Sequence, residues 1–433
     1  MSTLLHDARL ADGRVRDVRI ASGRIARVAE SVDAESHDRI IDADERLLLP
    51  GAIDAHVHFR EPGHGEKETW TTGSQSAVAG GVTTVVDQPN TTPPTVTGEA
   101  FDEKASLAAA SSVDYGINGG VTPDWDPASL FDRPMFALGE VFLADSTGDM
   151  GIDASLFADA VARAAEDDVV VTVHAEDAEL FDESARERDA GGTGRDADAD
   201  VWSQYRAAEA EAAAVERAVD VGADAGADIH VAHTSTPEGV DAAVAGDATC
   251  EATPHHLLLS RADATELGTY GRMNPPLRSE ERRSGLWQRL VDGDIDIVAT
   301  DHAPHTREQK EAGLWDAPSG VPGVETMLPL LLARAGEGEL SYERVRDVTA
   351  ANVASIFGLP RKGRIQEGYD ADLVLVDPDE IREIHGDNLH SKCGWTPFEG
   401  RDGVFPDLTL RGGEVVYDGE AVVGDSNGGN VRA

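Results

Sequence analysis

The sequence predicts an α/β protein built on a (β/α)8 TIM-like barrel, with a small β-sandwich domain formed by the two ends of the chain. Three observations carry this prediction. Strand-like and helix-like segments alternate through the middle of the chain, histidines stand where several of these strands end, and both termini consist of short strands separated by turns. A chain of 433 residues is long enough for such a barrel and one appendage.

The two ends of the chain have the pattern of a β domain. The first segment contains TLLHDARL, VRDVRI, RIARVAE and RIIDADERLLLP, and the last contains ADLVLVD and DLTLRGGEVVYDGEAVV. Short alternating segments with glycine-rich turns between them are typical of antiparallel strands. We therefore expect residues 1–50 and 359–433 to form one small β domain beside a barrel of residues 51–358.

Short apolar segments alternate with segments rich in Ala, Glu and Arg between these ends. The strand candidates are AIDAHV, VTTVVD, VDYGI, MFALGEVF, VVVTV, DIHVA and DIDIVAT, and residues 204–221 exemplify the helical stretches. Such alternation predicts parallel strands joined by helices. The number of units favours a closed barrel over an open sheet.

Charge and hydropathy exclude several classes of protein. The chain has 81 acidic and 37 basic residues, a formal net charge of −44 at pH 7. Nucleic-acid binding needs a cationic surface, so it is excluded. We expect a cytoplasmic protein, because no apolar run is long enough to cross a membrane and the N-terminus lacks a signal pattern. Cys250 and Cys393 form no CxxC pair, which argues against a disulfide framework or a thiolate zinc site.

The acidic residues are scattered among Ala, Gly and Val and do not form a single tail, which indicates a solvated shell on a halophilic protein. Self-repulsion of this shell is screened when molar salt shortens the Debye length to about 3 Å. We therefore expect the thermal unfolding midpoint to rise as KCl increases to molar concentrations. Calorimetry over a KCl series checks this, and a midpoint that is insensitive to salt would contradict it.

Histidines at the ends of predicted strands are the main functional signal. His56 and His58 close AIDAHVH, and alternate residues of a strand share one face, so both rings can point toward one ion. Three more candidates close other strands: His174, His233 and Asp301. Active sites of these barrels lie at the C-terminal ends of the strands. The pattern predicts a metal site with nitrogen and oxygen ligands, suited to Zn²⁺ and less specifically to Mn²⁺ or Co²⁺.

Two positions in this pattern have alternatives. His230 competes with His233 within the segment IHVAH, and we favour His233 because it is closer to the end of the strand. His255 and His256 follow another strand, and we interpret them as packing residues or as groups that support the ligands.

Motifs from about Pro50 to about Gly400 resemble those of the cyclic amidohydrolases, and most closely those of class I dihydroorotases. They are PGAIDAHVHFREPG, GGVTTVVDQPNTTPP, VHAED, HVAHTSTPEG, CEATPHHLLL, RMNPPLR, ATDHAPHT, GVPGVET and KCGWTPFEG, in the order of the family. The resemblance implies a (β/α)8 barrel with two zinc ions. It also implies reversible hydrolysis of the ring amide of dihydroorotate to carbamoyl aspartate, a step of pyrimidine biosynthesis.

The resemblance also implies roles for the metal-site residues. His56, His58 and Asp301 would hold one zinc ion, and His174 and His233 the other. The family's bridging carboxylate is commonly a carbamylated lysine, and Glu140 stands at that position in LGEVFLADSTG. Asp145 is the alternative bridge, and we favour Glu140. Asp301 would also be the catalytic base that moves the proton of the attacking water to the leaving ring nitrogen.

Substrate recognition is expected to depend on a cation that binds the ring carboxylate. Arginine suits this task because its planar guanidinium donates two charge-assisted hydrogen bonds. Arg60 stands at the family's carboxylate-binding position in HFREPG. The remaining residues that the resemblance places in the pocket are Asn90, Asn274, His305 and the backbone of Pro322 and Gly323.

Two other functions stay open at this point. An allantoinase or dihydropyrimidinase-like enzyme would share the metal site but act on neutral cyclic ureides, for which a cationic clamp is not expected. A metal-free scaffold partner of aspartate carbamoyltransferase would need no metal, yet every histidine position of the metal site is filled here. The sequence leaves open whether the protein forms a homo-oligomer.

Overall fold

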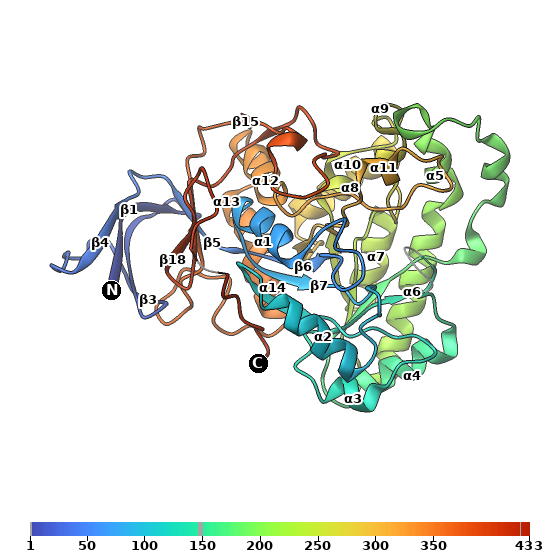
Figure 1. Cartoon of the computed structure of the whole chain (residues 1–433), viewed down its shortest axis with the longest axis horizontal. Coiled ribbons are helices and arrows are strands. Elements are labelled where there is room, and N and C mark those ends of the chain that lie inside the picture. Colours follow the sequence, from blue (N-terminus) through green and yellow to red (C-terminus); the bar gives the residue numbers. More distant parts are fainter. Residues whose placement is uncertain (1, 146–149, 425) are drawn as a thin grey trace.

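The computed structural model describes residues 2–145, 150–424 and 426–433. Figure 1 shows a barrel surrounded by helices, with a strand-rich part beside it that contains the N-terminus. The fold class predicted from the sequence is therefore confirmed.

Strands from both ends of the chain form one eight-stranded sheet, ordered β18-β17-β14-β5-β1-β2-β3 with β4 paired to β1. Its strands are β1 (Ser2–Leu10), β2 (Val15–Ala21), β3 (Arg24–Ala29), β4 (Asp38–Asp42), β5 (Leu47–Pro50), β14 (Leu373–Val376), β17 (Leu408–Arg411) and β18 (Glu414–Tyr417). Strand β5 joins the two ends, because it pairs in parallel with β1 and antiparallel with β14. Leu5, Leu48, Leu373 and Leu410 belong to the apolar cluster that this sheet buries.

Eight parallel strands form the barrel. They are β6 (Ala52–Val57), β7 (Val82–Asp87), β8 (Asp114–Ile117), β9 (Leu138–Phe142), β10 (Val171–His174), β11 (Ile229–Val231), β12 (Thr249–Ala252) and β13 (Ile297–Val298). Strands β6 to β8 form one ladder and β9 to β13 another. Parallel bridges from Gly119 to Leu138 and from Val57 to His302 join the two ladders, so the barrel is closed. At these two seams, isolated bridges replace a continuous ladder, so backbone pairing between neighbouring strands is sparsest there.

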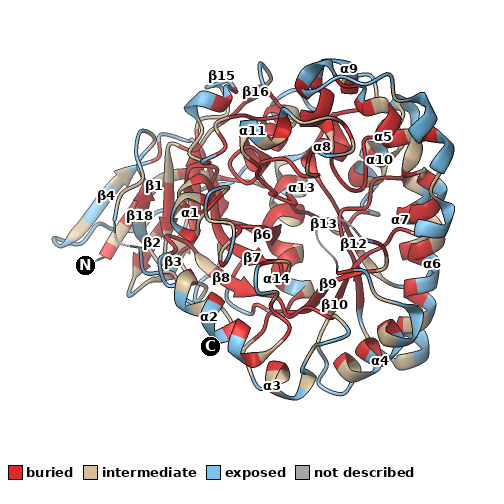
Figure 2. Ribbon diagram, turned by 45° about the vertical axis from the view of Figure 1, so that its right-hand side comes forward, coloured by how far each residue is buried: buried red, intermediate tan, exposed pale blue. Residues whose placement is uncertain are grey.

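Helices surround the barrel, and most of them have exposed residues on their outward faces, whereas the strands inside are buried (Figure 2). They are α1 (Trp70–Ala79), α2 (Gly98–Ala108), α3 (Pro127–Phe131), α4 (Ala154–Ala165), α5 (Ala199–Tyr205), α6 (Ala208–Ala225), α7 (Pro237–Ala245), α8 (Pro254–Leu258), α9 (Ala264–Leu267), α10 (Glu280–Asp292), α11 (Arg307–Lys310), α12 (Met327–Gly336), α13 (Tyr342–Arg346) and α14 (Asn352–Ile356). Strands β15 (Arg382–Glu383) and β16 (Asp402–Gly403) form a separate pair.

The helix expected over residues 204–221 is displaced toward the C-terminus. Helix α5 ends at Tyr205, and α6 begins at Ala208 and ends before Gly226, whose φ of 69° suits glycine. Arg206 lies between the two helices with non-helical backbone angles. Its guanidinium is buried against the Glu176 carboxylate, and this contact accompanies the break in the helix.

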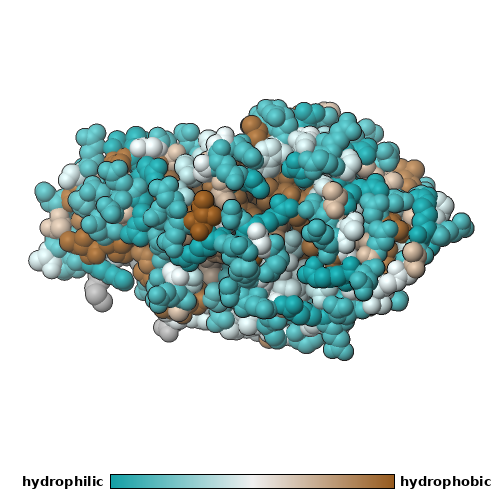
Figure 3. Space-filling model, turned by 90° about the horizontal axis from the view of Figure 1, so that it is seen from above, coloured by the Kyte–Doolittle hydropathy of each residue, from teal (hydrophilic) through white to brown (hydrophobic). Residues whose placement is uncertain are grey.

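The surface has the polar character that the highly charged composition predicts. Figure 3 shows a face that is mostly hydrophilic, with apolar groups in small patches. The large hydrophobic side chains that are exposed are scattered along the chain: Ile40, Leu180, Val244, Val291 and Ile381. Within the described residues, none of the helices combines the length and the apolar character that crossing a bilayer requires.

Candidate metal centre

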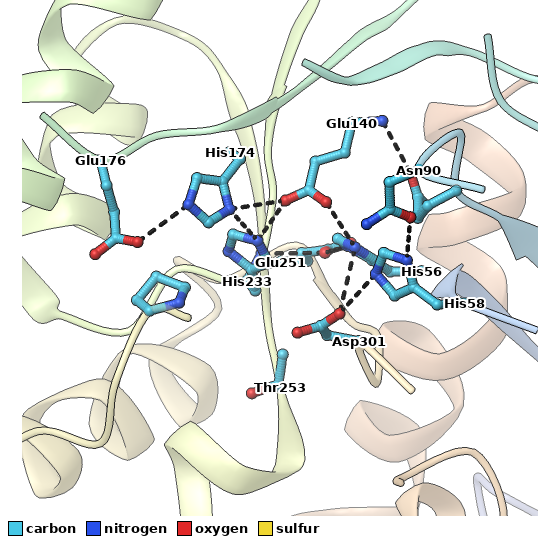
Figure 4. A network of polar contacts seen from close by, with 12 residues as sticks. His56, His58, Asn90, Glu140, His174, Glu176, His233, Glu251, Thr253 and Asp301 are labelled. Atoms are coloured by element: carbon cyan, nitrogen blue, oxygen red, sulfur yellow. Dashed lines mark hydrogen bonds and ion pairs between the residues drawn. The ribbon is translucent and has the colours of Figure 1, made fainter. Parts of the chain in front are cut away.

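The six predicted ligands come from five barrel strands or their ends and meet inside the barrel. His56 lies on β6 and His58 just after it, Glu140 lies on β9, and His174 ends β10. His233 and Asp301 follow β11 and β13. All six side chains are buried, although the chain is rich in exposed charge. Figure 4 shows them facing one another.

Glu140 is at the centre of the cluster. Its Oε1 is 2.6 Å from Nε2 of His233 and 3.0 Å from Nδ1 of His174, and its Oε2 is 3.4 Å from Nε2 of His56. One carboxylate therefore contacts histidines from three strands. Asp145, the alternative bridge, is exposed and accepts a hydrogen bond from the Gly151 N–H at 2.8 Å.

Asp301 forms a second group with the histidines of β6. Its Oδ1 is 2.9 Å from Nε2 of His58 and 3.7 Å from Nε2 of His56. Two sets of three candidate donor atoms, each within 4.8 Å of one another, share His56. One set adds His58 and Asp301, and the other adds Glu140 and His233. The arrangement offers two adjacent positions for cations.

A small cavity of about 20 Å³ adjoins this cluster, and its lining includes Arg60, Asn90 and Asn274. Arg60 is buried, and its φ of 67° turns the chain sharply after His58. Its Nη2 lies 3.2 Å from Nε2 of His305. Burial lowers the pKa of Arg60 to about 10, so its guanidinium stays positively charged at neutral pH.

The other predicted substrate residues differ in their position. Oδ1 of Asn90 accepts a hydrogen bond from Nδ1 of His58 at 2.7 Å, and Oδ1 of Asn274 accepts one from Nε1 of Trp202 at 3.0 Å. The backbone N–H of Gly323 donates to Nδ1 of His302 at 3.1 Å. Gly323 and the preceding Pro322 are not part of the cavity lining.

Comparison with known proteins adds to this geometry. Residues 47–431 match the amidohydrolase family. The chain belongs to the amidohydrolase family. This confirms the resemblance identified from the sequence motifs, which span most of the matched region.

Several relatives of this amidohydrolase are similar over almost the whole chain. A dihydroorotase of Halobacterium salinarum is 68% identical over 99% of both chains. An allantoinase of Rubrobacter xylanophilus is 36% identical over 90% of this chain and 88% of its own. Among solved structures, L-hydantoinase (dihydropyrimidinase) from Arthrobacter aurescens has a TM-score of 0.91 and 30% identity, and 98% of each chain is covered.

The donor atoms of this amidohydrolase fit a bound cation. Nε2 of His56 is buried, faces Glu140 and Asp301, and has no hydrogen-bond partner among the described residues. Burial alone would lower the pKa of His56, but the carboxylates of Glu251 and Glu140 raise it well above its usual value. The cluster thus attracts positive charge, which a divalent cation can supply in place of protons. Its imidazole and carboxylate donors suit Zn²⁺.

Glu251 supports the cluster and was missed in the sequence. Its Oε1 is 2.6 Å from Nδ1 of His56 and accepts the backbone N–H of His233 at 3.0 Å. Its Oε2 is 3.3 Å from Nε2 of His230, which lies behind the cluster. A carboxylate on the far nitrogen of a metal-binding histidine fixes the tautomer and leaves the other nitrogen for the metal. Its position in the motif CEATPHH, at a strand end, was the available signal.

Glu176 plays the same part behind His174. Its Oε2 is 3.0 Å from Nε2 of His174 and accepts a hydrogen bond from the buried guanidinium of Arg206 at 2.5 Å. Burial alone would lower the pKa of His174, but contacts with Glu140 and Glu176 raise it to about 9. Glu176 therefore orients the ring so that Nδ1 faces Glu140.

Replacing Glu251 with glutamine is expected to weaken metal binding roughly 10- to 100-fold, the usual effect of losing a carboxylate behind a ligand. The amide keeps the volume but removes the charge that holds the Nδ1–H tautomer of His56. Metal retained after dialysis against a chelator measures the effect. Glu238→Gln is the control, since Glu238 is exposed and pairs with Arg282. Full metal retention by Glu251→Gln would contradict the supporting role.

Proposed function

We propose that this amidohydrolase is a dihydroorotase, which reversibly hydrolyses the ring amide of dihydroorotate to carbamoyl aspartate. The observation that carries the proposal is the buried guanidinium of Arg60 at the cavity beside the histidine and carboxylate cluster. A cation there suits a substrate with a ring carboxylate, whereas a neutral ureide offers it no charged partner. The similarity to the Halobacterium dihydroorotase supports the same substrate.

The metal centre is proposed to hold two zinc ions. Residues that would hold the first are His56, His58 and Asp301, those that would hold the second are His174 and His233, and Glu140 would contact both. When bound, the ions polarise the ring carbonyl and lower the pKa of water enough for it to attack at neutral pH. The contacts of Glu140 with histidines of both groups support this assignment.

Asp301 moves the proton in the proposed reaction. Its Oδ1 contacts the two histidines of β6, whereas its Oδ2 takes part in no hydrogen bond or ion pair with the described residues. As water adds to the ring carbonyl carbon, Oδ2 accepts its proton. The carbon–nitrogen bond then breaks, and Asp301 delivers the proton to the leaving ring nitrogen. The products are the ureido group and a new carboxylic acid, which releases the second proton of the water to solvent and becomes a carboxylate.

Four side chains are proposed to hold the substrate. Arg60 donates to the ring carboxylate, and His305 beside it and the amides of Asn90 and Asn274 complete that end of the pocket. The backbone at Pro322 and Gly323 stays a proposed contact for the ring imide. Fixing the ring in this way places its amide over the metal cluster and lowers the entropic cost of reaching a reactive orientation.

The cellular role follows from the reaction. We propose a cytoplasmic enzyme of pyrimidine biosynthesis that works at high salt, with residues 51–358 as the catalytic domain. Residues 1–50 and 359–433 would together form the second domain. The molar mass in solution decides whether the chain forms a homo-oligomer.

Ring opening of dihydroorotate in molar KCl, followed by ultraviolet absorbance, tests the proposal. We expect turnover of dihydroorotate, its loss after treatment with a chelator, and its recovery with Zn²⁺. Allantoin and dihydrouracil are the control substrates. Preferential turnover of either control would favour an allantoinase or a dihydropyrimidinase-like enzyme. Metal-free protein without turnover would favour a scaffold.

A further inference from the structure

Glu140 lies in an irregularity of the barrel. Leu138 pairs with Val171 and Val141 pairs with Val173, so two residues of β9 stand opposite the single residue Thr172 of β10. An extra residue of this kind is a β-bulge, which changes the direction of a side chain and takes one N–H out of the ladder. The bulge therefore redirects Glu140 at the point where it contacts the histidines.

Gly139 makes the bulge sterically feasible. Its φ of 141° is a conformation that L side chains rarely adopt. A Cβ atom there would lie 2.3 Å from the backbone oxygen of Thr172. The residue before Glu140 thus has no room for a side chain, and the bulge depends on glycine.

Gln88 accepts the N–H that the bulge frees. Its Oε1 accepts the backbone N–H of Glu140 at 2.9 Å and Nδ2–H of Asn118 at 3.0 Å. Its Nε2 donates to the backbone oxygen of Ala55, next to His56, at 3.2 Å. A backbone N–H can only donate, so the oxygen of the Gln88 amide must face Glu140. The buried amide thereby connects the strand of His56 with that of Glu140.

Both ends of this connection are fixed. The backbone N–H of Gln88 donates to Val57 at 3.0 Å, and its carbonyl accepts from the buried ammonium of Lys104 at 2.5 Å. Asn118 holds the amide from the other side, because its Oδ1 accepts the backbone N–H of Ala137 at 3.1 Å. These side-chain bonds cross the seam between β8 and β9, where the backbone ladder is thin.

We propose that Gln88, oriented by Asn118, is the positioning residue that fixes the Glu140 carboxylate between the two histidine groups. The inference rests on the proposed metal-binding role of Glu140. The same QPNT segment also positions His58 through Asn90, so one turn after β7 orients ligands on both sides of the centre. Loss of the Gln88 acceptor would let the bulge and its carboxylate shift.

The test compares zinc binding by wild type, Gln88→Met and Thr84→Val after metal removal, in molar KCl. Methionine keeps the length of the side chain but cannot replace the amide oxygen as an acceptor. Thr84 is a matched control on β7, the strand that ends just before Gln88, because its buried hydroxyl has no hydrogen-bond partner among the described residues. Competition with a chromophoric chelator gives the affinities, and calorimetry gives the thermal midpoints with and without Zn²⁺.

We expect Gln88→Met to bind one of the two zinc equivalents 10- to 100-fold more weakly, and Thr84→Val to bind as wild type does. A positioning role also reduces the rise in thermal midpoint that zinc produces. A purely structural role would lower both midpoints equally. Wild-type zinc affinity in folded, metal-free Gln88→Met would overturn the proposal.

A second variant decides the question if Gln88→Met does not fold without metal. Asn118→Ser keeps Gln88 but removes the donor that orients its amide. We therefore expect this variant to fold and to lose less zinc affinity than Gln88→Met. Unchanged affinity in Asn118→Ser would then overturn the proposal. Turnover of dihydroorotate by wild type is measured on the same preparation. An inactive wild type that binds zinc refutes the proposed substrate and leaves the positioning role standing.

Discussion

Asp301→Asn is expected to lower the turnover number for dihydroorotate by roughly 10²- to 10⁴-fold, the usual contribution of a general acid–base group. The Michaelis constant should change little, because the substrate is held by Arg60 and not by Asp301. Asparagine keeps the shape and can still offer an oxygen to a metal, but it cannot take a proton from water. Steady-state kinetics in molar KCl measure both constants.

The physical basis of this effect is the environment of the carboxylate. Burial alone would raise the pKa of Asp301, but hydrogen bonding to His58 and the nearby charge of His56 lower it below its usual value. The group is therefore ionised at neutral pH and can accept a proton. Removing this base leaves the other contacts of the site in place, so the loss should appear in the chemical step.

Asp145→Asn provides the matched control. It makes the same change of acid to amide at an exposed carboxylate that contacts Gly151. We expect unchanged turnover and metal content in this variant. A large loss in Asp145→Asn would instead support Asp145 as the bridging ligand. Wild-type turnover in Asp301→Asn would exclude Asp301 as the base.

The sequence was sufficient for the barrel and for most of the predicted cluster. The position of a histidine at a strand end can be predicted, because the parallel strands of a barrel all end on one face. His56, His58, His174 and His233 therefore meet as soon as the strands are placed in order. The strands of the small β domain could be predicted equally well, since their apolar and polar residues alternate and the strands end at glycine turns.

The supporting residues could not be identified in the same way. Glu176 and Glu251 are two of 81 acidic residues, and although they lie in the motifs VHAED and CEATPHH, their residue type alone does not separate them from a solvated surface. Their role appears only when burial and the far nitrogens of His174 and His56 are known. Gln88 was still harder to identify from the sequence, because its partner is a backbone N–H freed by a bulge. One extra residue in a strand leaves no mark in hydrophobic periodicity.

Arg60→Met is expected to raise the Michaelis constant for dihydroorotate roughly 10- to 100-fold, with a smaller change in turnover. Hydrogen bonds to a charged group contribute about 1.5–3 kcal/mol, and each 1.4 kcal/mol corresponds to a factor of about ten. Methionine fills a similar volume without donors. Metal content should stay at the wild-type value, because the polar contacts of Arg60 are with His305 and Pro304 and, among the described residues, it has no hydrogen bond to a predicted ligand.

Dihydrouracil separates substrate binding from structural damage in the Arg60 variant, because it has the same ring amide but lacks the carboxylate. If the guanidinium binds that carboxylate, Arg60→Met lowers kcat/KM for dihydroorotate and leaves any slow turnover of dihydrouracil unchanged. Arg60→Lys should recover part of the loss, since an ammonium supplies the charge but not the paired donors. An equal loss for both substrates would mean that Arg60 mainly supports the turn after His58, and the assignment of the substrate would then lose its principal support.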